Sequence, residues 1–205
     1  MAKARPPEAP VTEAARLGAP YEPVIFAKLA DVLEALKAGA IDATFTNASP
    51  ARAREFDFGP PYLHLELGYL VPRGGVIGKI EDVDAEGRLI GVTAASTSQA
   101  TLGREFRKAK LVPAETLAVA IDMLASGKMD AFATNKAILY EMAEKLPGSK
   151  VLDGRWGLEH FAIGIPKGRD GGRAFIRAFS EDIVATGFVK AAVGRAGLRG
   201  STDAQ

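Results

Sequence analysis

Two short segments combine hydroxyl, amide and guanidinium groups where a strand is expected to lead into a helix. The first is Thr46-Asn-Ala-Ser-Pro-Ala-Arg52, in which Ser49 and Pro50 are typical of a helix start. The free backbone N–H groups of such a turn attract anions, and the planar fork of Arg52 suits a carboxylate. Taken alone, however, this motif is better explained as a capped surface turn with Arg52 solvated or paired with Glu55.

The second segment is Thr93-Ala-Ala-Ser-Thr-Ser-Gln99, which follows an apolar strand and opens a helix. Its hydroxyl groups and backbone amides, those of Ser96 and Thr97 among them, could cradle an anionic group. The Gly-Lys-Ser/Thr ending of a P-loop is absent. Taken alone, the segment is better explained as an ordinary serine or threonine helix cap.

The residue types that usually carry catalysis or metals are scarce. The chain has no cysteine and only two histidines, His64 and His160, which excludes thiol chemistry and thiolate zinc sites. Neither histidine has the spacing of a nucleophile–base pair. His64 is interpreted as structural, and His160, beside Glu159, as structural or as a hinge or pocket residue. The sequence therefore predicts no catalytic residue, no metal and no cofactor.

An internal repeat links two corners of the chain. Residues 31–47 align without gaps on residues 119–135, and 6 of the 17 positions are identical. Each copy is an amphipathic helix, a glycine and a short strand that ends in Thr-Asn. The similarity could arise by chance, because a helix, a glycine and a strand follow one another in many α/β proteins. If the copies instead form two equivalent lobes, both Thr-Asn pairs lie at a shared cleft, because ligands bind beyond the carboxyl ends of strands.

The elements that must position these groups alternate between strand and helix, which predicts an α/β fold with largely parallel sheets. Expected strands cover residues 21–26, 41–45, 65–71, 89–92, 111–112, 129–133, 150–152 and 161–165. Expected helices cover residues 11–17, 29–37, 98–108, 116–126, 136–145, 173–186 and 188–196. Residues 1–10 are expected to be irregular, and 200–205 a frayed end.

Composition restricts the class of protein further. The 205 residues carry 26 basic and 25 acidic side chains, so no basic excess favours nucleic-acid binding. Hydrophobic residues make up 47%, as in ordinary globular proteins. No apolar run reaches the roughly 18 residues of a membrane helix. The polar, proline-rich start is unlike a signal peptide.

The segment from Asn47 to Tyr62 resembles the signature of family 3 solute-binding proteins of bacterial ABC importers. That family typically reads Thr-x-Thr-Pro-x-Arg and then Asp-Phe-Ser-x-Pro-Tyr. The resemblance continues through residues 80–83, 87–92, 127–131 and 164–168, and it covers about residues 12–199. It implies the type II periplasmic-binding fold, in which two α/β lobes close around a ligand by hinge motion. Lobe 1 would comprise residues 1–72 and 158–205, and lobe 2 residues 73–157.

The same resemblance implies roles for individual residues. Arg52 looks like the arginine that clamps an α-carboxylate, and Ser96 and Thr97 match the loop that also holds it. Asn135 stands where amino-acid binders usually carry an aspartate for the α-ammonium group, so Asn135→Asp is expected to raise affinity for amino acids. The candidate ligand-binding residues are Arg52, Asn47, Ser49, Ser96, Thr97 and Asn135.

The chain also departs from the family at its start, where it enters near the end of the usual first helix. The first lobe would then lack its first strand, which leaves an unpaired edge beside residues 41–45 and favours self-association. The resemblance implies a periplasmic protein that binds a small polar carboxylate or amino acid and docks on permease subunits. It implies no nucleic-acid partner.

Two other functions share this fold. A dehydratase of cyclic carboxylates would need an acid in the cleft, for which Glu159 is the candidate. The effector domain of a transcription regulator would dimerise rather than dock on a permease. Enzymatic turnover and dimerisation would distinguish these alternatives from transport.

Overall fold

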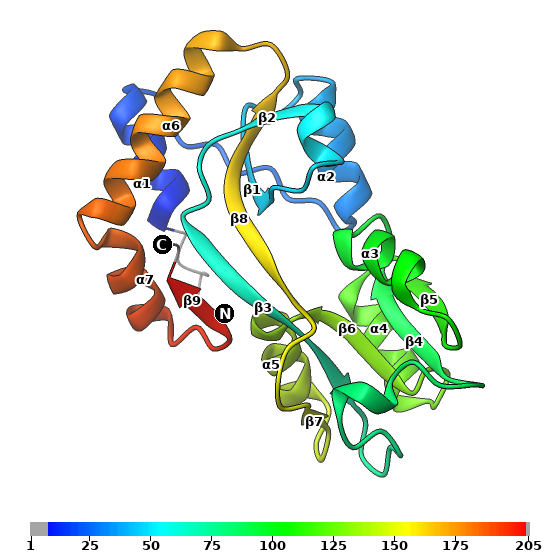
Figure 1. Ribbon diagram of the computed structural model, residues 1–205. Coiled ribbons are helices and arrows are strands. Elements are labelled where there is room, and N and C mark those ends of the chain that lie inside the picture. Colours follow the sequence, from blue (N-terminus) through cyan, green and yellow to red (C-terminus); the bar gives the residue numbers. More distant parts are fainter. Residues whose placement is uncertain (1–7, 204–205) are drawn as a thin grey trace.

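The computed structural model describes residues 8–203, which form two unequal halves joined by two long strands (Figure 1). The helices are α1 (Glu8–Leu17), α2 (Leu29–Lys37), α3 (Thr97–Glu105), α4 (Leu117–Ala125), α5 (Lys136–Lys145), α6 (Asp170–Ala185) and α7 (Phe188–Ala196). The strands are β1 (Thr44–Asn47), β2 (Phe56–Phe58), β3 (Leu63–Val71), β4 (Leu89–Thr93), β5 (Lys110–Ala114), β6 (Ala131–Asn135), β7 (Lys150–Val151), β8 (Gly157–Pro166) and β9 (Ser201–Asp203).

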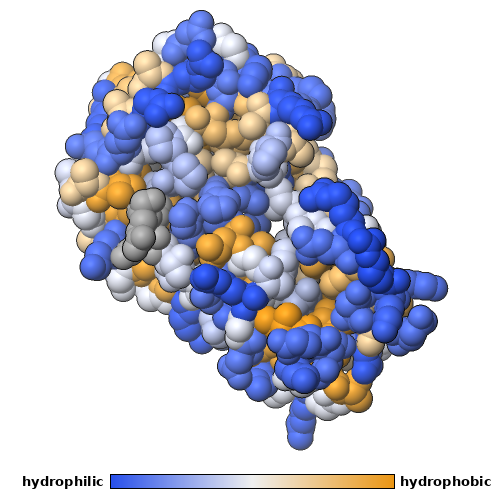
Figure 2. Space-filling view, viewed as in Figure 1, coloured by the Kyte–Doolittle hydropathy of each residue, from blue (hydrophilic) through white to orange (hydrophobic). Residues whose placement is uncertain are grey.

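Strands β3 and β8 run antiparallel to each other through the middle of the molecule, with Leu63 opposite Phe161 and Leu67 opposite Gly157. We call the part with α1, α2, β1, β2, α6 and α7 the first half. The part with α3, α4, α5, β4, β5 and β6 is the second half. Figure 2 shows the two halves as separate masses with a narrower middle. Among the described residues, no helix is long and apolar enough to cross a membrane.

The prediction of largely parallel sheets is wrong. Among the described strands only the pairs β4–β5 and β4–β6 are parallel. The other pairings, which involve β3 or β8, are antiparallel. The alternation of helices and strands indicated crossovers correctly in the second half. It could not reveal that β3 and β8 run through both halves and form antiparallel pairs with strands of each.

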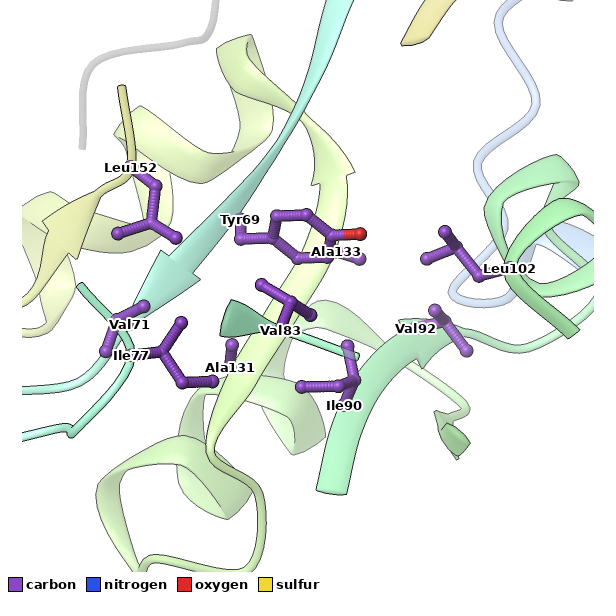
Figure 3. Packing of buried hydrophobic residues seen from close by; sticks show 10 residues of the cluster. All are labelled: Tyr69, Val71, Ile77, Val83, Ile90, Val92, Leu102, Ala131, Ala133 and Leu152. Atoms are coloured by element: carbon purple, nitrogen blue, oxygen red, sulfur yellow. The ribbon is translucent and has the colours of Figure 1, made fainter. Parts of the chain in front are cut away.

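Each half has its own core. In the second half, β4 and β6 are covered on both faces, and Ile90, Val92, Ala131 and Ala133 are fully buried in one of the two clusters there (Figure 3). In the first half, Ile163 and Ile165 of β8 pack against the apolar face of α6. Separate cores allow the halves to act as separate rigid bodies, since packed interiors transmit displacement without deforming.

Three further predictions fail at the edges of the fold. Residues 21–26, predicted as a strand, form no helix or strand and pair with no described strand. The tail is not frayed as far as it is described, because Ser201–Asp203 pairs with β3. The predicted helix over 98–108 ends at Glu105, since Phe106 adopts an extended backbone with ψ of 137°. The predictions of an irregular start and a frayed end also cover residues 1–7 and 204–205, which lie outside the residues that the structure describes.

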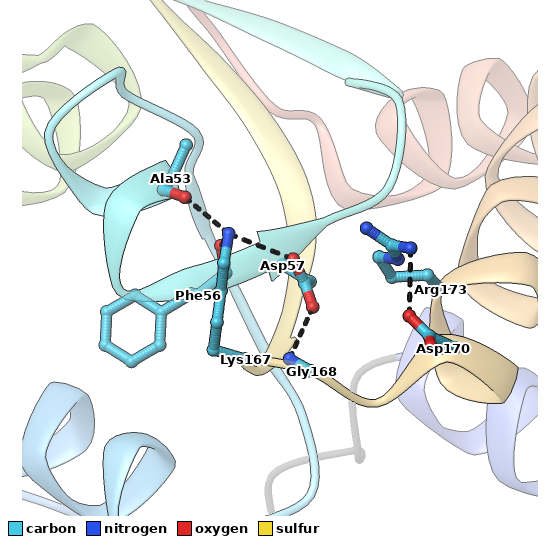
Figure 4. Close-up of polar contacts among 7 residues, drawn as sticks. All are labelled: Ala53, Phe56, Asp57, Lys167, Gly168, Asp170 and Arg173. Atoms are coloured by element: carbon cyan, nitrogen blue, oxygen red, sulfur yellow. Dashed lines mark hydrogen bonds and ion pairs between the residues drawn. The ribbon is translucent and has the colours of Figure 1, made fainter.

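Asp57 in β2 contacts the turn that follows β8, more than a hundred residues later in the chain. The Asp57 carboxylate accepts a hydrogen bond from the backbone N–H of Gly168 at 2.8 Å and forms an ion pair with Lys167 at 3.1 Å (Figure 4). Burial raises the pKa of Asp57, but these partners outweigh it and hold that pKa below its ordinary value. Asp57 in β2 therefore fixes the turn between β8 and α6, which is a structural role.

Asp57→Asn is expected to destabilise the protein by about 2 kcal/mol, because the neutral amide loses the ion pair with Lys167 and weakens the hydrogen bond from Gly168. Urea denaturation at neutral pH measures the change. Asp42→Asn is the matched control: Asp42 also pairs with an arginine at 2.8 Å, but its side chain is 92% exposed. Such a surface pair contributes little. Equal losses in the two variants would contradict the assigned role.

Candidate functional site

Arg52 is buried and only 9% exposed, although it begins a short 3-10 turn (Arg52–Arg54) of the first half. Its Nη1 donates to the hydroxyl of Thr46 at 2.8 Å and to the backbone carbonyl of Asn47 at 3.3 Å. Among the described residues, both of its hydrogen bonds use this one nitrogen. Burial lowers the pKa of Arg52, and the carboxylate of Glu159 counteracts that shift. An arginine pKa starts so high that the group stays charged.

Asn47, at the end of β1, connects the two halves directly. Its Nδ2 donates to Oγ1 of Thr97 in the second half at 2.9 Å. Its Oδ1 accepts a hydrogen bond from the backbone N–H of His160 on β8 at 2.8 Å. The amide thus bridges the first half, the second half and one of the connecting strands.

The loop before α3 presents Thr97 while Ser96 serves the helix itself. The hydroxyl of Ser96 caps α3 by accepting from the backbone N–H of Gln99 at 3.0 Å. The Oε1 of Gln99 in turn accepts a hydrogen bond from the backbone N–H of Ala95 at 2.8 Å. Ala95 has a φ of 58°, a left-handed conformation that is costly for a residue with a Cβ. This tight turn projects the Thr97 hydroxyl toward Asn47.

Asn135 ends β6 and begins α5 in the same way that Asn47 ends β1. Its Oδ1 caps α5 by accepting from the backbone N–H of Ile138 at 3.1 Å. Its Nδ2 donates to Oε2 of Glu159 at 3.0 Å. Thr134, the preceding residue of the repeat, is also buried. Both Thr-Asn corners predicted from the repeat therefore face the middle of the molecule.

Glu159 completes the cluster from strand β8. Its Oε1 lies 3.4 Å from the hydroxyl of Thr97, which donates to it. The side chain is 8% exposed. Burial raises the pKa of Glu159, although hydrogen bonds from Asn135 and Thr97 and the charge of Arg52 oppose the shift. One buried cation and one buried acid thus lie in a single polar network.

The structure brings four of the six sequence-predicted site residues into this network: Arg52, Asn47, Thr97 and Asn135. The other two act locally, since Ser49 accepts from the backbone N–H of Arg52 at 3.2 Å and Ser96 caps α3. Glu159 was not among the predicted ligand-binding residues. The available signal was one acid in the otherwise apolar run of β8. His160 packs its ring edge-on against His64 with centroids 4.7 Å apart, so its backbone is what serves the site.

Comparisons with known proteins agree with this architecture. The chain is 29% identical over 130 residues to the ABC transporter glutamine-binding protein GlnH of Bacillus subtilis (strain 168). The aligned region is 63% of this chain and 47% of that protein. It is 28% identical over 134 residues to a glutamine-binding protein of Geobacillus stearothermophilus, covering 64% and 51%. The chain thus spans about half the length of these curated relatives. No protein-family model matches it.

Solved structures show the same fold. The substrate binding protein of an amino acid ABC transporter superposes with a TM-score of 0.82 at 19% identity, over 92% of this chain and 84% of that one. The ancestral amino acid-binding protein AncCDT-1, a precursor of cyclohexadienyl dehydratase, superposes with a TM-score of 0.78 at 23% identity, over 91% and 82%.

The fold is therefore the type II periplasmic-binding fold, with a polar site between two α/β halves. The two sequence relatives are named as glutamine-binding proteins, and the motif around Arg52 is similar to the signature of family 3 solute-binding proteins.

Proposed function

We propose that this protein is the solute-binding component of an ABC importer and binds a small polar carboxylate, an amino acid among them, between its two halves. The observation that carries the proposal is the buried guanidinium of Arg52 beside polar groups from both halves. A charged group in that position needs an anionic partner, and the ligand carboxylate supplies one. The names of the two sequence relatives make L-glutamine the first ligand to test.

The lobes that close on the ligand are proposed to be residues 1–72 with 158–205 and residues 73–157. These boundaries fall at the second-half ends of β3 and β8, the two long strands that join the halves. The hydrogen bond between Asn47 and Thr97 would then hold the closed state. Outside the cytoplasmic membrane, the closed form would dock on permease subunits, and this protein would itself catalyse no reaction.

Isothermal titration calorimetry with the standard L-amino acids and with simple carboxylates tests the proposal. Saturable binding of at least one of these compounds is the expected result. If protein that melts cooperatively shows no binding to any of these compounds, the proposed function is wrong.

A dehydratase remains the second candidate, because Glu159 is a buried acid of raised pKa in the site and AncCDT-1 has the same fold. Such an enzyme would release water from a cyclic carboxylate, with Glu159 as the proton donor. Turnover that Glu159→Gln abolishes would favour this function over binding alone. Nothing in the described residues favours the regulator alternative, and the two sequence relatives are named as glutamine-binding proteins.

The edge of β1 is the proposed surface for self-association with a second copy. β1 pairs only with β8 among the described strands. A hollow of about 620 Å³ borders its other side, lined by residues of α1, of the 19–26 segment and of β1. Val24 is 59% exposed and Ile25 92%. An unpaired strand edge beside apolar side chains favours association with another chain.

Ile25→Lys is therefore expected to lower the fraction of dimer at a given concentration. Sedimentation velocity over a concentration series measures it. Val119→Lys on α4 is the matched control, since Val119 is also exposed, at 42%, but lies in the second half. Equal self-association of wild type and Ile25→Lys would contradict the assigned surface.

A further inference from the structure

The hollow beside β1 contains a buried acid to which the described residues supply no partner. Glu13 of α1 lines this hollow of about 620 Å³, and the residue is only 7% exposed. No hydrogen bond or ion pair of the described residues reaches its carboxyl group. Burial raises the pKa of Glu13 to about 7, and no donor or cation opposes that shift. A buried acid without a partner favours a ligand that brings one.

The charged groups around the hollow leave this acid uncompensated. Arg16, on the same helix, is engaged elsewhere, because it pairs with Asp182 of α6 at 2.6 Å. Among the described residues no basic side chain lines the hollow, and the charged residues that do are Glu13, Glu22 and Asp42. Asp42 has a cation of its own, since it pairs with Arg169 at 2.8 Å. The hollow is therefore negative in character, and Glu13 is its buried charge.

Three aromatic side chains line the same hollow. Tyr21 and Phe26 come from the segment between α1 and α2, and Phe45 comes from β1. All three are half-buried, so that part of each side chain remains accessible. The face of an aromatic ring attracts a cation, and the attraction increases where water is excluded. Aromatic side chains around a single buried acid suit an organic cation that has an apolar body.

The size of the hollow also suits a small molecule, since such sites usually measure about 300–1,000 Å³. Its remaining lining is largely apolar and includes Leu17, Val32 and Ile41. None of the lining residues belongs to the network around Arg52 and Glu159. The hollow is therefore a separate place on the first half.

We propose that this hollow is a second binding site, which takes a small organic ammonium ion with an aromatic or branched aliphatic body. The ammonium group donates a charge-assisted hydrogen bond to the carboxylate of Glu13, and the apolar body lies against the three aromatic side chains. This inference goes beyond the proposed function, because its residues lie outside the site between the halves.

Calorimetry with phenethylamine tests the site at about pH 8, where the carboxyl group of Glu13 is mostly ionised and the amine is protonated. The protein is used at concentrations at which it sediments as a monomer, because a second copy at the edge of β1 would cover the hollow. Saturable binding is expected. Phenethyl alcohol, which has the same ring and no charge, should bind at least about tenfold more weakly. Equal affinities for amine and alcohol would overturn the proposal.

Glu13→Gln removes the charge and keeps the shape of the side chain. It is expected to weaken binding of the amine about tenfold or more and to leave the affinity for the alcohol unchanged. A folding defect would not mimic this result, because loss of a buried charge should stabilise the protein at this pH. Glu22→Gln is the matched control: it removes an exposed acid beside the same hollow and should bind the amine as the wild type does. Wild-type affinity for the amine in Glu13→Gln would contradict the assigned role of Glu13.

Competition separates this site from the one between the halves. A saturating concentration of the amino acid that binds most tightly in the panel above should leave the affinity for phenethylamine unchanged. Displacement of the amine by that amino acid would place it in the network around Arg52 and overturn the inference. A wild type that binds phenethylamine but no amino acid or carboxylate would contradict the proposed function alone. One that binds amino acids but not phenethylamine would overturn the second site alone.

Discussion

Replacing Arg52 by glutamine is expected to weaken binding of a carboxylate ligand by about 100-fold or more. Two hydrogen bonds between a guanidinium and a carboxylate contribute about 1.5 kcal/mol or more each, and each 1.4 kcal/mol is a factor of ten in affinity. Arg52 is suited to this because Nη1 is already held by Thr46 and Asn47, which orients the rest of the fork. Calorimetry with the amino acid that the wild type binds measures the loss.

Two variants show whether the fork or only the charge matters. Arg52→Lys keeps the charge and loses the paired geometry, so an intermediate affinity is expected. Arg54→Gln removes a charge from the same turn, but Arg54 is exposed and should bind as the wild type does. An Arg52→Gln variant that melts cooperatively and binds with wild-type affinity would contradict the proposal that Arg52 binds the ligand carboxylate.

The sequence sufficed for the elements whose signals are local. The apolar spacing in residues 29–37 and the glycine after it predicted α2 correctly, and α5 and α7 were also placed with correct bounds. The repeat predicted that Asn47 and Asn135 end equivalent strands, and the structure confirms this placement. Periodicity and helix stops are properties of neighbouring residues, so no tertiary information was needed.

Other features depend on distant partners and were therefore missed. The segment 21–26 has a strand-like composition, but no described strand lies beside it to pair with. β9 forms only because β3 offers an edge to the tail. β2 is three residues long and is held to the turn after β8 by Asp57. Strand propensity does not reveal whether a partner exists.

Glu159 illustrates the same limit within the site. In sequence it is one acid in an apolar run, next to a histidine. Only the crossing of β8 between the halves brings it to Thr97 and Asn135. The departure at Asn135 was visible in the sequence, but the hydrogen bond between Asn135 and Glu159 was not. Asn135→Asp, expected from the sequence to raise affinity for amino acids, would also place a second carboxylate beside Glu159, and the repulsion between them would raise the pKa of one of the two.

Glu13 is expected to make the folded protein less stable at alkaline than at mildly acidic pH. Its carboxyl group on α1 is only 7% exposed, and burial raises its pKa from 4.5 to about 7. The folded state therefore holds the proton more tightly than the unfolded chain does. This contribution to stability is complete below the unfolded pKa and is lost as pH rises through the folded one. A shift of this size corresponds to about 3 kcal/mol.

Glu13→Gln isolates that contribution, because the amide keeps the shape of the side chain and does not ionise. The difference in unfolding free energy between variant and wild type should grow in favour of the variant from about pH 5 to about pH 8, which for a chain of this size raises the melting temperature by roughly 5–10 °C. Glu22→Gln, beside the same hollow but exposed, should follow the wild type. Other buried acids such as Glu159 shift stability in the same direction, but they are common to both proteins and cancel in the difference. Parallel pH profiles for wild type and Glu13→Gln would mean that the carboxyl group of Glu13 reaches water in the folded protein.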